Sequence, residues 1–169
     1  MPNVFQGNIA AAAGRFAVVV SRFNESITSR LLDGAVRTLT ENGVADERID
    51  VAWTPGAFEI PTVANRLAAT GRYAAVICLG AVVKGETTHD QHINRAVSTA
   101  LCKLGVRYGL PVLFGLLTCN TLEQAIARSG GRASTTGKDQ SDARVGNKGV
   151  DCALAALEMV DLMSKLPVR

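Results

Sequence analysis

Four short, predominantly apolar runs recur along the chain, and they constrain its fold more than any other feature. The runs cover residues 16–21, 49–53, 73–83 and 111–117. The first, FAVVVS, is almost wholly apolar and rich in β-branched residues, which is typical of a strand covered on both faces of a parallel sheet. The sequence therefore predicts a sheet whose strands are these four runs.

Segments with helical spacing separate these runs. After the first run, apolar side chains recur on one side of a predicted helix that Gly43 is placed to end: Ile27, Leu31, Ala35, Val36 and Leu39. Further helices are predicted over 60–68 and 93–104, from a capping box at Thr121, and over 149–166. Strands that alternate with helices in this way predict an α/β fold with a parallel sheet between helical layers.

Composition indicates one ordinary globular domain over residues 1–169. Apolar residues make up 47% of the chain and charged residues 20%, and the net charge is only +3. No basic run is present that would neutralise a string of phosphates, so nucleic acid is not an expected partner. The sequence shows no charged leader and no apolar stretch of about 20 residues, so we expect a cytoplasmic protein without a membrane span.

Three further features bear on organisation. The four cysteines, Cys78, Cys102, Cys119 and Cys152, are far apart and form no CxxC pair, which predicts free, buried thiols. Residues 130–148 are expected to form a long polar, glycine-containing loop, and residues 1–14 an N-terminal arm that does not join its own sheet.

Polar residues and aromatic residues gather where each predicted strand ends. They occur at 21–24, 54–59, 84–89 and 118–121. In an open parallel sheet, loops converge beyond the carboxyl ends of the strands, and ligands bind there. We therefore expect the functional site at this edge of the sheet.

The segment KGETTH at 84–89 is the most informative of these strand ends. Gly85 allows a close backbone approach, and Thr87 or Thr88 is placed to cap the next helix, whose free amides would hold an anion such as phosphate. A cap without a ligand explains the threonines equally well. His89 is the best candidate for acid/base chemistry near neutral pH, the alternative being a histidine that only caps the helix.

Other candidates have a functional and a structural interpretation. Phe23 and Phe58 are placed to stack on a planar ring, or to pack under neighbouring loops. Arg128 and Lys148 flank the long loop, and the Arg128 guanidinium is suited to bind a phosphate, although exposed, solvated charges are the default for both. His89 and His92 lack an accompanying cysteine or carboxylate cluster, so no metal is expected.

Five segments, taken together, resemble the 6,7-dimethyl-8-ribityllumazine synthase family of riboflavin biosynthesis. They occur in the family's order and span almost the whole chain: RFN at 22–24, PGAFEIP at 55–61, GAVVKGETTH at 80–89, TLEQAIAR at 121–128 and GNKGVDCALAALEM at 146–159. The resemblance implies a flavodoxin-like three-layer sandwich with a four-stranded parallel sheet. It also implies a reaction that joins 5-amino-6-(D-ribitylamino)uracil to 3,4-dihydroxy-2-butanone 4-phosphate, with loss of phosphate and water and without a cofactor.

The resemblance also implies a homo-oligomer. Relatives form pentamers, some of which build icosahedral shells, and the site lies between subunits, with Phe114 reaching in from a neighbour. By the same resemblance, the arm at 1–14 would pack on a neighbouring subunit. A single copy would therefore hold an incomplete site, and the size of the full assembly stays open.

The resemblance assigns roles to individual residues. Phe23 would stack on the pyrimidine, and His89 would move protons. The ring and the ribityl chain would be lined by Ala57, Phe58, Glu59, Val82 and Val83, whereas Glu86, Thr87 and Arg128 would hold the phosphate, and Lys148 and Asp151 would lie near the site.

The chain departs from the family pattern at two places. Residues Asp90, Gln91 and His92 stand where the family commonly has Phe, an acidic residue and Tyr. The loop after Arg128 is longer than the family's, so its basic residue corresponds to either Arg132 or Arg144. A lumazine- or flavin-binding protein, or an assembly subunit without turnover, is the alternative function, and a phosphate-binding regulatory domain would leave the two phenylalanines unexplained.

Overall fold

The computed structural model describes residues 1–9, 13–131 and 146–168. Four parallel strands form one sheet in the order β2-β1-β3-β4. Their bounds are β1 Arg15–Ser21, β2 Ile49–Thr54, β3 Tyr73–Val83 and β4 Val112–Cys119. All four predicted strands are confirmed. β4 continues past its predicted end at Leu117, so that Thr118 and Cys119 form the carboxyl end of this strand.

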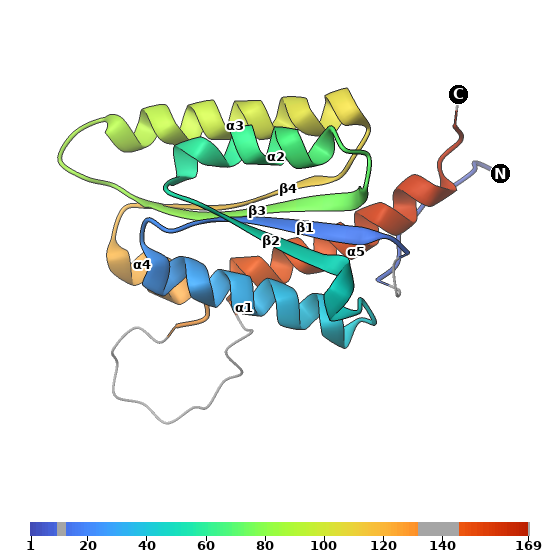
Figure 1. Ribbon diagram of the computed structural model, residues 1–169, viewed down its shortest axis with the longest axis horizontal. Coiled ribbons are helices and arrows are strands. Elements are labelled where there is room, and N and C mark those ends of the chain that lie inside the picture. The colour runs from blue at the N-terminus through green and yellow to red at the C-terminus, as the bar shows by residue number, and fades with distance from the viewer. Residues whose placement is uncertain (10–12, 132–145, 169) are drawn as a thin grey trace.

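Helices cover both faces of the sheet, so the predicted α/β sandwich is confirmed (Figure 1). One face carries α1 Glu25–Glu41, α4 Leu122–Arg128 and α5 Lys148–Lys165, and the other carries α2 Ile60–Ala68 and α3 His89–Tyr108. Two short 3-10 turns, η1 Asp46–Arg48 and η2 Ala57–Glu59, lie on either side of β2 in the sequence. The predicted capping box opens α4, where Thr121 accepts a hydrogen bond from the Gln124 amide at 3.2 Å.

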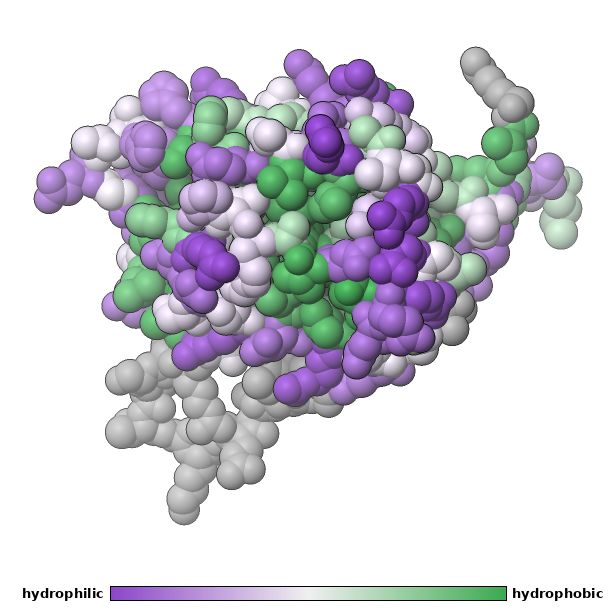
Figure 2. Space-filling view, viewed as in Figure 1, coloured by the Kyte–Doolittle hydropathy of each residue, from purple (hydrophilic) through white to green (hydrophobic). Residues whose placement is uncertain are grey.

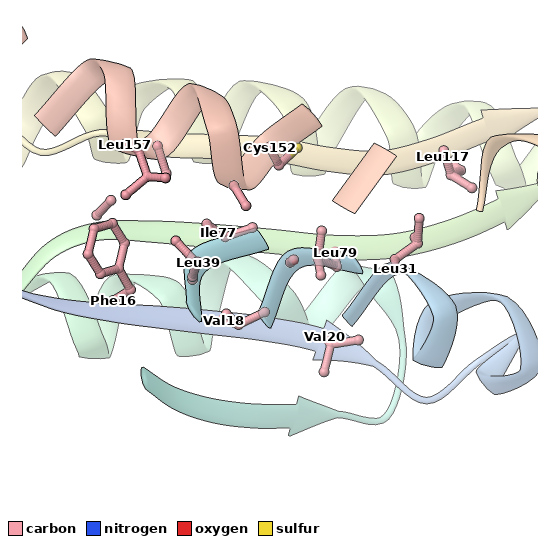
Figure 3. Close-up of a cluster of buried hydrophobic side chains, with 14 of the residues drawn as sticks. Phe16, Val18, Val20, Leu31, Leu39, Ile77, Leu79, Leu117, Cys152 and Leu157 are labelled. Carbon is pink, nitrogen blue, oxygen red and sulfur yellow. The ribbon is translucent and has the colours of Figure 1, made fainter. Parts of the chain in front are cut away.

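The two helical layers explain the unbroken apolar run of β1. Phe16, Val18 and Val20 point into the layer that α1 and α5 cover, whereas Ala17 and Val19 face α2 and α3. Figure 3 shows the first set meeting side chains of β3, α1 and α5. Since successive residues of a strand point to opposite faces, burial on both sides requires an apolar residue at every position.

A polar cluster ties three strands together at the amino ends, away from the expected site. The Arg15 guanidinium donates hydrogen bonds to both carboxylate oxygens of Asp50 at 2.9 and 3.0 Å, and the Tyr73 hydroxyl donates to Oδ2 at 2.8 Å. These bonds, the one from Arg15 first, hold the pKa of Asp50 below its usual value. The cluster therefore fixes the order of β2, β1 and β3 at this end.

The N-terminal arm lies along α5 of its own chain and, over residues 1–9, contains no strand. Gly7 is buried so closely against the Glu158 carbonyl that a Cβ would clash with it. The Asn8 amide donates to Asp161 at 2.6 Å, and Lys165 donates to the Gln6 carbonyl at 3.0 Å. Packing of the arm on a neighbouring subunit stays a prediction.

The cysteines are free, but not all are buried. Cys78 and Cys152 lie in the core, Cys119 is half-buried and Cys102 is exposed. The expectation of buried thiols is therefore wrong for Cys102, because it follows Leu101 by one residue, about 100° around α3 from the apolar stripe. In the part of the chain that the structure describes, no helix has the length and apolar character needed to cross a bilayer.

Candidate active site

A cavity of about 400 Å³ opens beyond the carboxyl ends of β1, β2 and β3. The chain crosses here from β1 outward to β2 and later returns to place β3 on the other side of β1, which is the point where parallel sheets bind ligands. The lining residues come from three strand ends and the start of α3: Phe23, Gly56, Ala57, Phe58, Glu59, Ala81, Val82, Val83, Gly85, Thr87, His89, Asp90 and Ile93. Separate βα turns therefore build one concave site.

The turn after β1 holds Phe23 at the rim of this cavity. Asn24 adopts the left-handed conformation (φ 61°), which asparagine tolerates better than most residues. Its side-chain amide donates to the Ala81 carbonyl at 2.9 Å, and the Phe23 amide donates to the Pro55 carbonyl at 3.1 Å. The turn is thereby tied to both β3 and the segment after β2.

The two phenylalanines are not packed under loops. Phe23 is 70% exposed and Phe58 is 60% exposed, and both line the cavity. Exposed aromatic faces at the rim of a concave site are suited to stacking on a planar ring. The structure thus disagrees with the structural interpretation that the sequence left open for this pair.

The turn from β3 into α3 presents unpaired amides. In the described part of the chain, the amides of Gly85, Glu86, Thr87 and Thr88 donate to no protein acceptor. Thr88 is the N-cap residue of α3 but makes no side-chain capping bond, and the Thr87 hydroxyl accepts from the His89 amide only at 3.4 Å. Threonine caps therefore do not account for this turn, whereas an anion at the N-terminus of this helix would be stabilised.

His89 is the first residue of α3 and lines the cavity between Thr87 and Asp90. Its side chain is exposed, and no hydrogen bond or ion pair joins its ring to another described residue. An imidazole that is not engaged with the protein is free to exchange protons with a bound molecule. The ring does not serve as a helix cap.

A second pocket, of about 480 Å³, lies at the β4 edge of the sheet and contains Arg128 and Lys148. Residues Leu116 to Cys119 line its strand side. No carboxylate of the described chain pairs with either cation. Burial raises the pKa of the Cys119 thiol, and the Arg128 charge partly opposes that rise. Two unneutralised cations in one pocket make it suited to an anion.

The buried side chain of Asn147 positions Lys148 and Arg128 relative to each other. Its amide donates to the carbonyls of Arg30 and Ser129 at 3.0 and 3.1 Å, and its oxygen accepts from the Gly149 amide at 2.8 Å. One residue thus caps α5 and joins it to α1 and to the end of α4. Asn147 was not among the site residues expected from the sequence.

The remaining predicted residues fall into three groups. Ala57, Glu59, Val82 and Val83 line the cavity as expected. Outside the linings of the cavity and the second pocket lie Glu86, exposed on the turn before α3, Phe114, which is 39% exposed on β4, and Asp151, exposed in the first turn of α5. Arg132 and Arg144 lie outside the described residues.

The cavity also contains residues that the sequence analysis did not place in the site. They are Gly56, Ala81, Asp90 and Ile93. Gly56 belongs to the polar strand end at 54–59, so its position in the sequence could have indicated that it lines the site. Asp90 and Ile93 are three residues apart on α3, so they lie on the same face of this helix. Which face of α3 meets the cavity depends on how the helix packs, so the sequence did not indicate these two residues.

His92 lies apart from the cavity. It lines an open surface of α3 with Arg95, Ala96 and Lys103. The described residues include no group of three or more His, Cys, Asp or Glu side chains that could hold a metal ion.

Known proteins match the chain along almost its whole length. Residues 13–164 match the family model described as 6,7-dimethyl-8-ribityllumazine synthase. A relative from Desulfotalea psychrophila, named 6,7-dimethyl-8-ribityllumazine synthase, is 46% identical over 166 residues, which cover 98% of this chain and 99% of the relative. The chain belongs to the 6,7-dimethyl-8-ribityllumazine synthase family.

Proposed function

We propose that the protein condenses 5-amino-6-(D-ribitylamino)uracil with 3,4-dihydroxy-2-butanone 4-phosphate, giving 6,7-dimethyl-8-ribityllumazine, phosphate and water. The observation that carries this proposal is the composition of one cavity. It combines the exposed ring of Phe23, the free amides of the turn before α3 and the unengaged imidazole of His89. The reaction needs a surface on which a planar amine can stack, a binding site for a phosphate and a group that carries protons. The three features of the cavity meet these needs in that order.

The pyrimidine would stack on Phe23, with its ribityl chain along Ala57, Glu59 and Val82. The phosphate of the ketone would lie against the amides from Gly85 to Thr88, at the N-terminus of α3. This arrangement directs the ketone carbon towards the pyrimidine's amine. Holding two reactants in this way supplies much of the acceleration of a condensation, because it removes the entropy cost of bringing them together.

His89 would transfer protons in each step. The amine attacks the ketone and one water leaves to form an imine. Loss of the proton on the adjacent carbon then expels phosphate, which takes the electron pair of the broken C–O bond, and leaves an enol. The enol becomes a ketone, and the second amine attacks this ketone to close the ring with loss of a second water. Each step moves a proton to or from nitrogen or oxygen, and an imidazole gives and accepts protons near neutral pH. No strong protein nucleophile is needed.

Charge supports a site shared between copies. Of the charged residues lining the cavity, Glu59 and Asp90 are acidic, and neither Lys nor Arg is among the described lining residues. The unpaired cations, Arg128 and Lys148, lie in the second pocket. A phosphate bound near a carboxylate-lined wall requires cations, so we propose that the second pocket of a neighbouring copy completes the cavity, with exposed Phe114 reaching in from the same β4 edge.

We propose a homopentamer as the unit of assembly. Figure 2 shows a hydrophobic patch in the middle of one face, in the region where Figure 1 shows β2. β2 is an edge strand, and Val51 on it is 43% exposed. The arm exposes Val4, Phe5 and Ile9, which suits it to cover apolar surface on a neighbour.

The free cysteines support a cytoplasmic location, which we propose as well. Cys102 is exposed and unpaired. Thiols of this kind persist in a reducing compartment, whereas secreted proteins of this size more often pair theirs.

The test is turnover by the purified protein. With both substrates present, we expect a fluorescent lumazine to form and phosphate to be released in equal amounts, and omission of either substrate should abolish both signals. Tight binding of the lumazine without either signal would instead support a binding protein that has lost turnover, the function suggested by the altered segment from Asp90 to His92.

A further inference from the structure

The guanidinium of Arg22 lies over the indole ring of Trp53, with its central carbon 5.0 Å from the ring centroid. Arg22 directly follows β1, and Trp53 is the next-to-last residue of β2, the neighbouring strand. A guanidinium within about 6 Å of an aromatic face is attracted to the ring, most strongly when the ring is an indole. A side-chain contact therefore joins the turn after β1 to β2.

This contact lies on the opposite face of the sheet from the cavity. Trp53 packs against the core layer that α1 and α5 cover. Phe23, the residue after Arg22, lines the cavity together with Val82 and Ile93, which belong to the layer that α2 and α3 cover. Fixing the Arg22 side chain on one face therefore limits how the turn can rotate and keeps the Phe23 ring on the other face.

Phe23 lies between two side-chain anchors. On its C-terminal side, Asn24 donates to the Ala81 carbonyl at 2.9 Å, and on its N-terminal side, Arg22 stacks on Trp53. The Phe23 ring itself is 70% exposed, so packing does little to hold it. The position of this ring therefore depends on the residues on either side of it in the sequence.

We infer that Arg22 is a positioning residue: by stacking on Trp53, it holds Phe23 where the uracil substrate stacks. The inference rests on the proposed function, in which the pyrimidine lies on Phe23. The phosphate of the ketone would bind on the turn after β3, whereas Arg22 is tied to β2. Arg22 should therefore affect binding of the uracil much more than binding of the ketone.

Removing either partner of the stack should raise the KM for ribitylaminouracil. Arg22→Met removes the charge and keeps the aliphatic stem, and the Arg22 side chain is 59% exposed, so this variant should fold. We expect the uracil KM to rise about two- to fivefold in Arg22→Met and in Trp53→Leu, with the ketone KM and kcat nearly unchanged. The double variant should show no larger rise than either single variant, because both substitutions remove the same contact. Arg22→Lys keeps a cation and should show a smaller rise.

Two other contacts of arginine side chains supply controls. The Arg107 guanidinium lies over the Tyr108 ring at 5.3 Å, at the end of α3, and neither residue lines the cavity or the second pocket. Arg107→Met removes the same kind of contact and should leave both KM values unchanged. Glu25 lies 3.8 Å from Arg22, but both side chains are more than half exposed, so their ion pair contributes little. Glu25→Gln should therefore also leave both KM values unchanged.

The inference fails if both KM values rise equally, or if the double variant shows the product of the two single rises. It also fails if Arg107→Met or Glu25→Gln shows the same rise as Arg22→Met, or if the uracil KM of Arg22→Met is unchanged. If Trp53→Leu does not fold, Trp53→Phe replaces it. This ring attracts a cation less strongly, so Arg22→Met should raise the uracil KM less in that background, and an equal rise contradicts the inference.

A failure of the proposed function can be told apart from a failure of this inference. If the wild type shows no turnover, the proposed function fails, and hydrogen–deuterium exchange of the segment that contains the Phe23 amide tests the positioning role without substrate. Faster exchange in Arg22→Met than in wild type, with an unchanged rate in Arg107→Met, supports the role of Arg22. Equal exchange rates in Arg22→Met and wild type overturn it.

Discussion

The side-chain amide of Asn24 donates a hydrogen bond to the main-chain carbonyl of Ala81 at 2.9 Å, and so joins the turn after β1 to the end of β3. The hydrogen bond links the ends of β1 and β3 beside the cavity. It holds Asn24, the residue after Phe23, in place. Because Asn24 also adopts a left-handed backbone conformation, its two properties can be separated by substitution.

Replacing Asn24 should weaken substrate binding in two graded steps. Asn24→Gly keeps the backbone conformation but loses the bond to Ala81, and should cost about 1 kcal/mol of stability. Asn24→Ala adds the strain of a left-handed alanine, a further cost of about 1–2 kcal/mol. Both should raise the KM for the uracil substrate, because Phe23 is less well held. Denaturant unfolding and steady-state kinetics measure the two effects.

Asn42→Ala is the control for this pair. Asn42 donates a similar bond, to the Thr38 carbonyl at 2.7 Å, but it lies at the other end of α1. This variant should lose stability without a change in KM. Equal stabilities of the Gly and Ala variants at position 24 would contradict the role given to its conformation.

His89→Asn should lower kcat by about 10²–10⁴-fold with a much smaller effect on either KM, because proton transfer acts in the transition state. His92→Asn tests whether any histidine near the start of α3 matters, since His92 lies on the open surface instead of in the cavity. Stopped-flow absorbance of lumazine formation gives both constants. Similar rates for the two variants would remove His89 from its proposed role.

Arg128→Met should raise the KM for the phosphorylated ketone by about 10–100-fold, the usual effect of losing a hydrogen bond between charged groups. Inhibition by inorganic phosphate should weaken in parallel. Arg66→Met, on the exposed side of α2, removes a positive charge elsewhere and should change neither value. A larger effect on the uracil KM than on the ketone KM would contradict the assignment.

Asp50→Asn should destabilise the fold by about 1 kcal/mol near neutral pH without an effect on KM, because the cluster with Arg15 and Tyr73 lies at the amino ends of the strands. The pKa of Asp50 is lowered in the folded state, so its stabilising effect is present above the unfolded pKa of about 3.9 and is lost as pH falls through the folded pKa. Unfolding free energies of wild type and variant should therefore converge below about pH 4.

Asp46→Asn, in the surface turn η1, controls for the loss of one negative charge. It should cost less than Asp50→Asn at neutral pH. If the difference in unfolding free energy between wild type and Asp50→Asn stayed constant down to the lowest pH, the negative charge of the carboxylate would not be what stabilises the cluster.

The strands and the location of the site were predictable because they depend on local pattern. The unbroken apolar run from Phe16 to Val20 requires burial on both faces, and the polar strand ends can converge only at one edge of a parallel sheet. The extension of β4 was not predictable in the same way, since Thr118 and Cys119 lack the apolar character of the run before them.

Features that depend on packing between distant segments escaped prediction. Asn147 joins α1, α4 and α5 through bonds to residues far away in sequence, such as Arg30. The inward direction of Asp90 follows from how α3 lies on the sheet. The separation of Arg128 from His89 into two pockets likewise follows only from the three-dimensional arrangement.

Subunit mixing tests the central claim, that the cavity of one copy and the basic pocket of another form one site. His89→Ala and Arg128→Met would be co-expressed in equal amounts so that mixed assemblies form. Activity would be measured at a ketone concentration well below the raised KM, where each variant alone should be nearly inactive. If sites are shared, about a quarter of them would carry both native residues, and activity should recover to about a quarter of the wild-type value. Activity no greater than the average of the two variants would contradict the account.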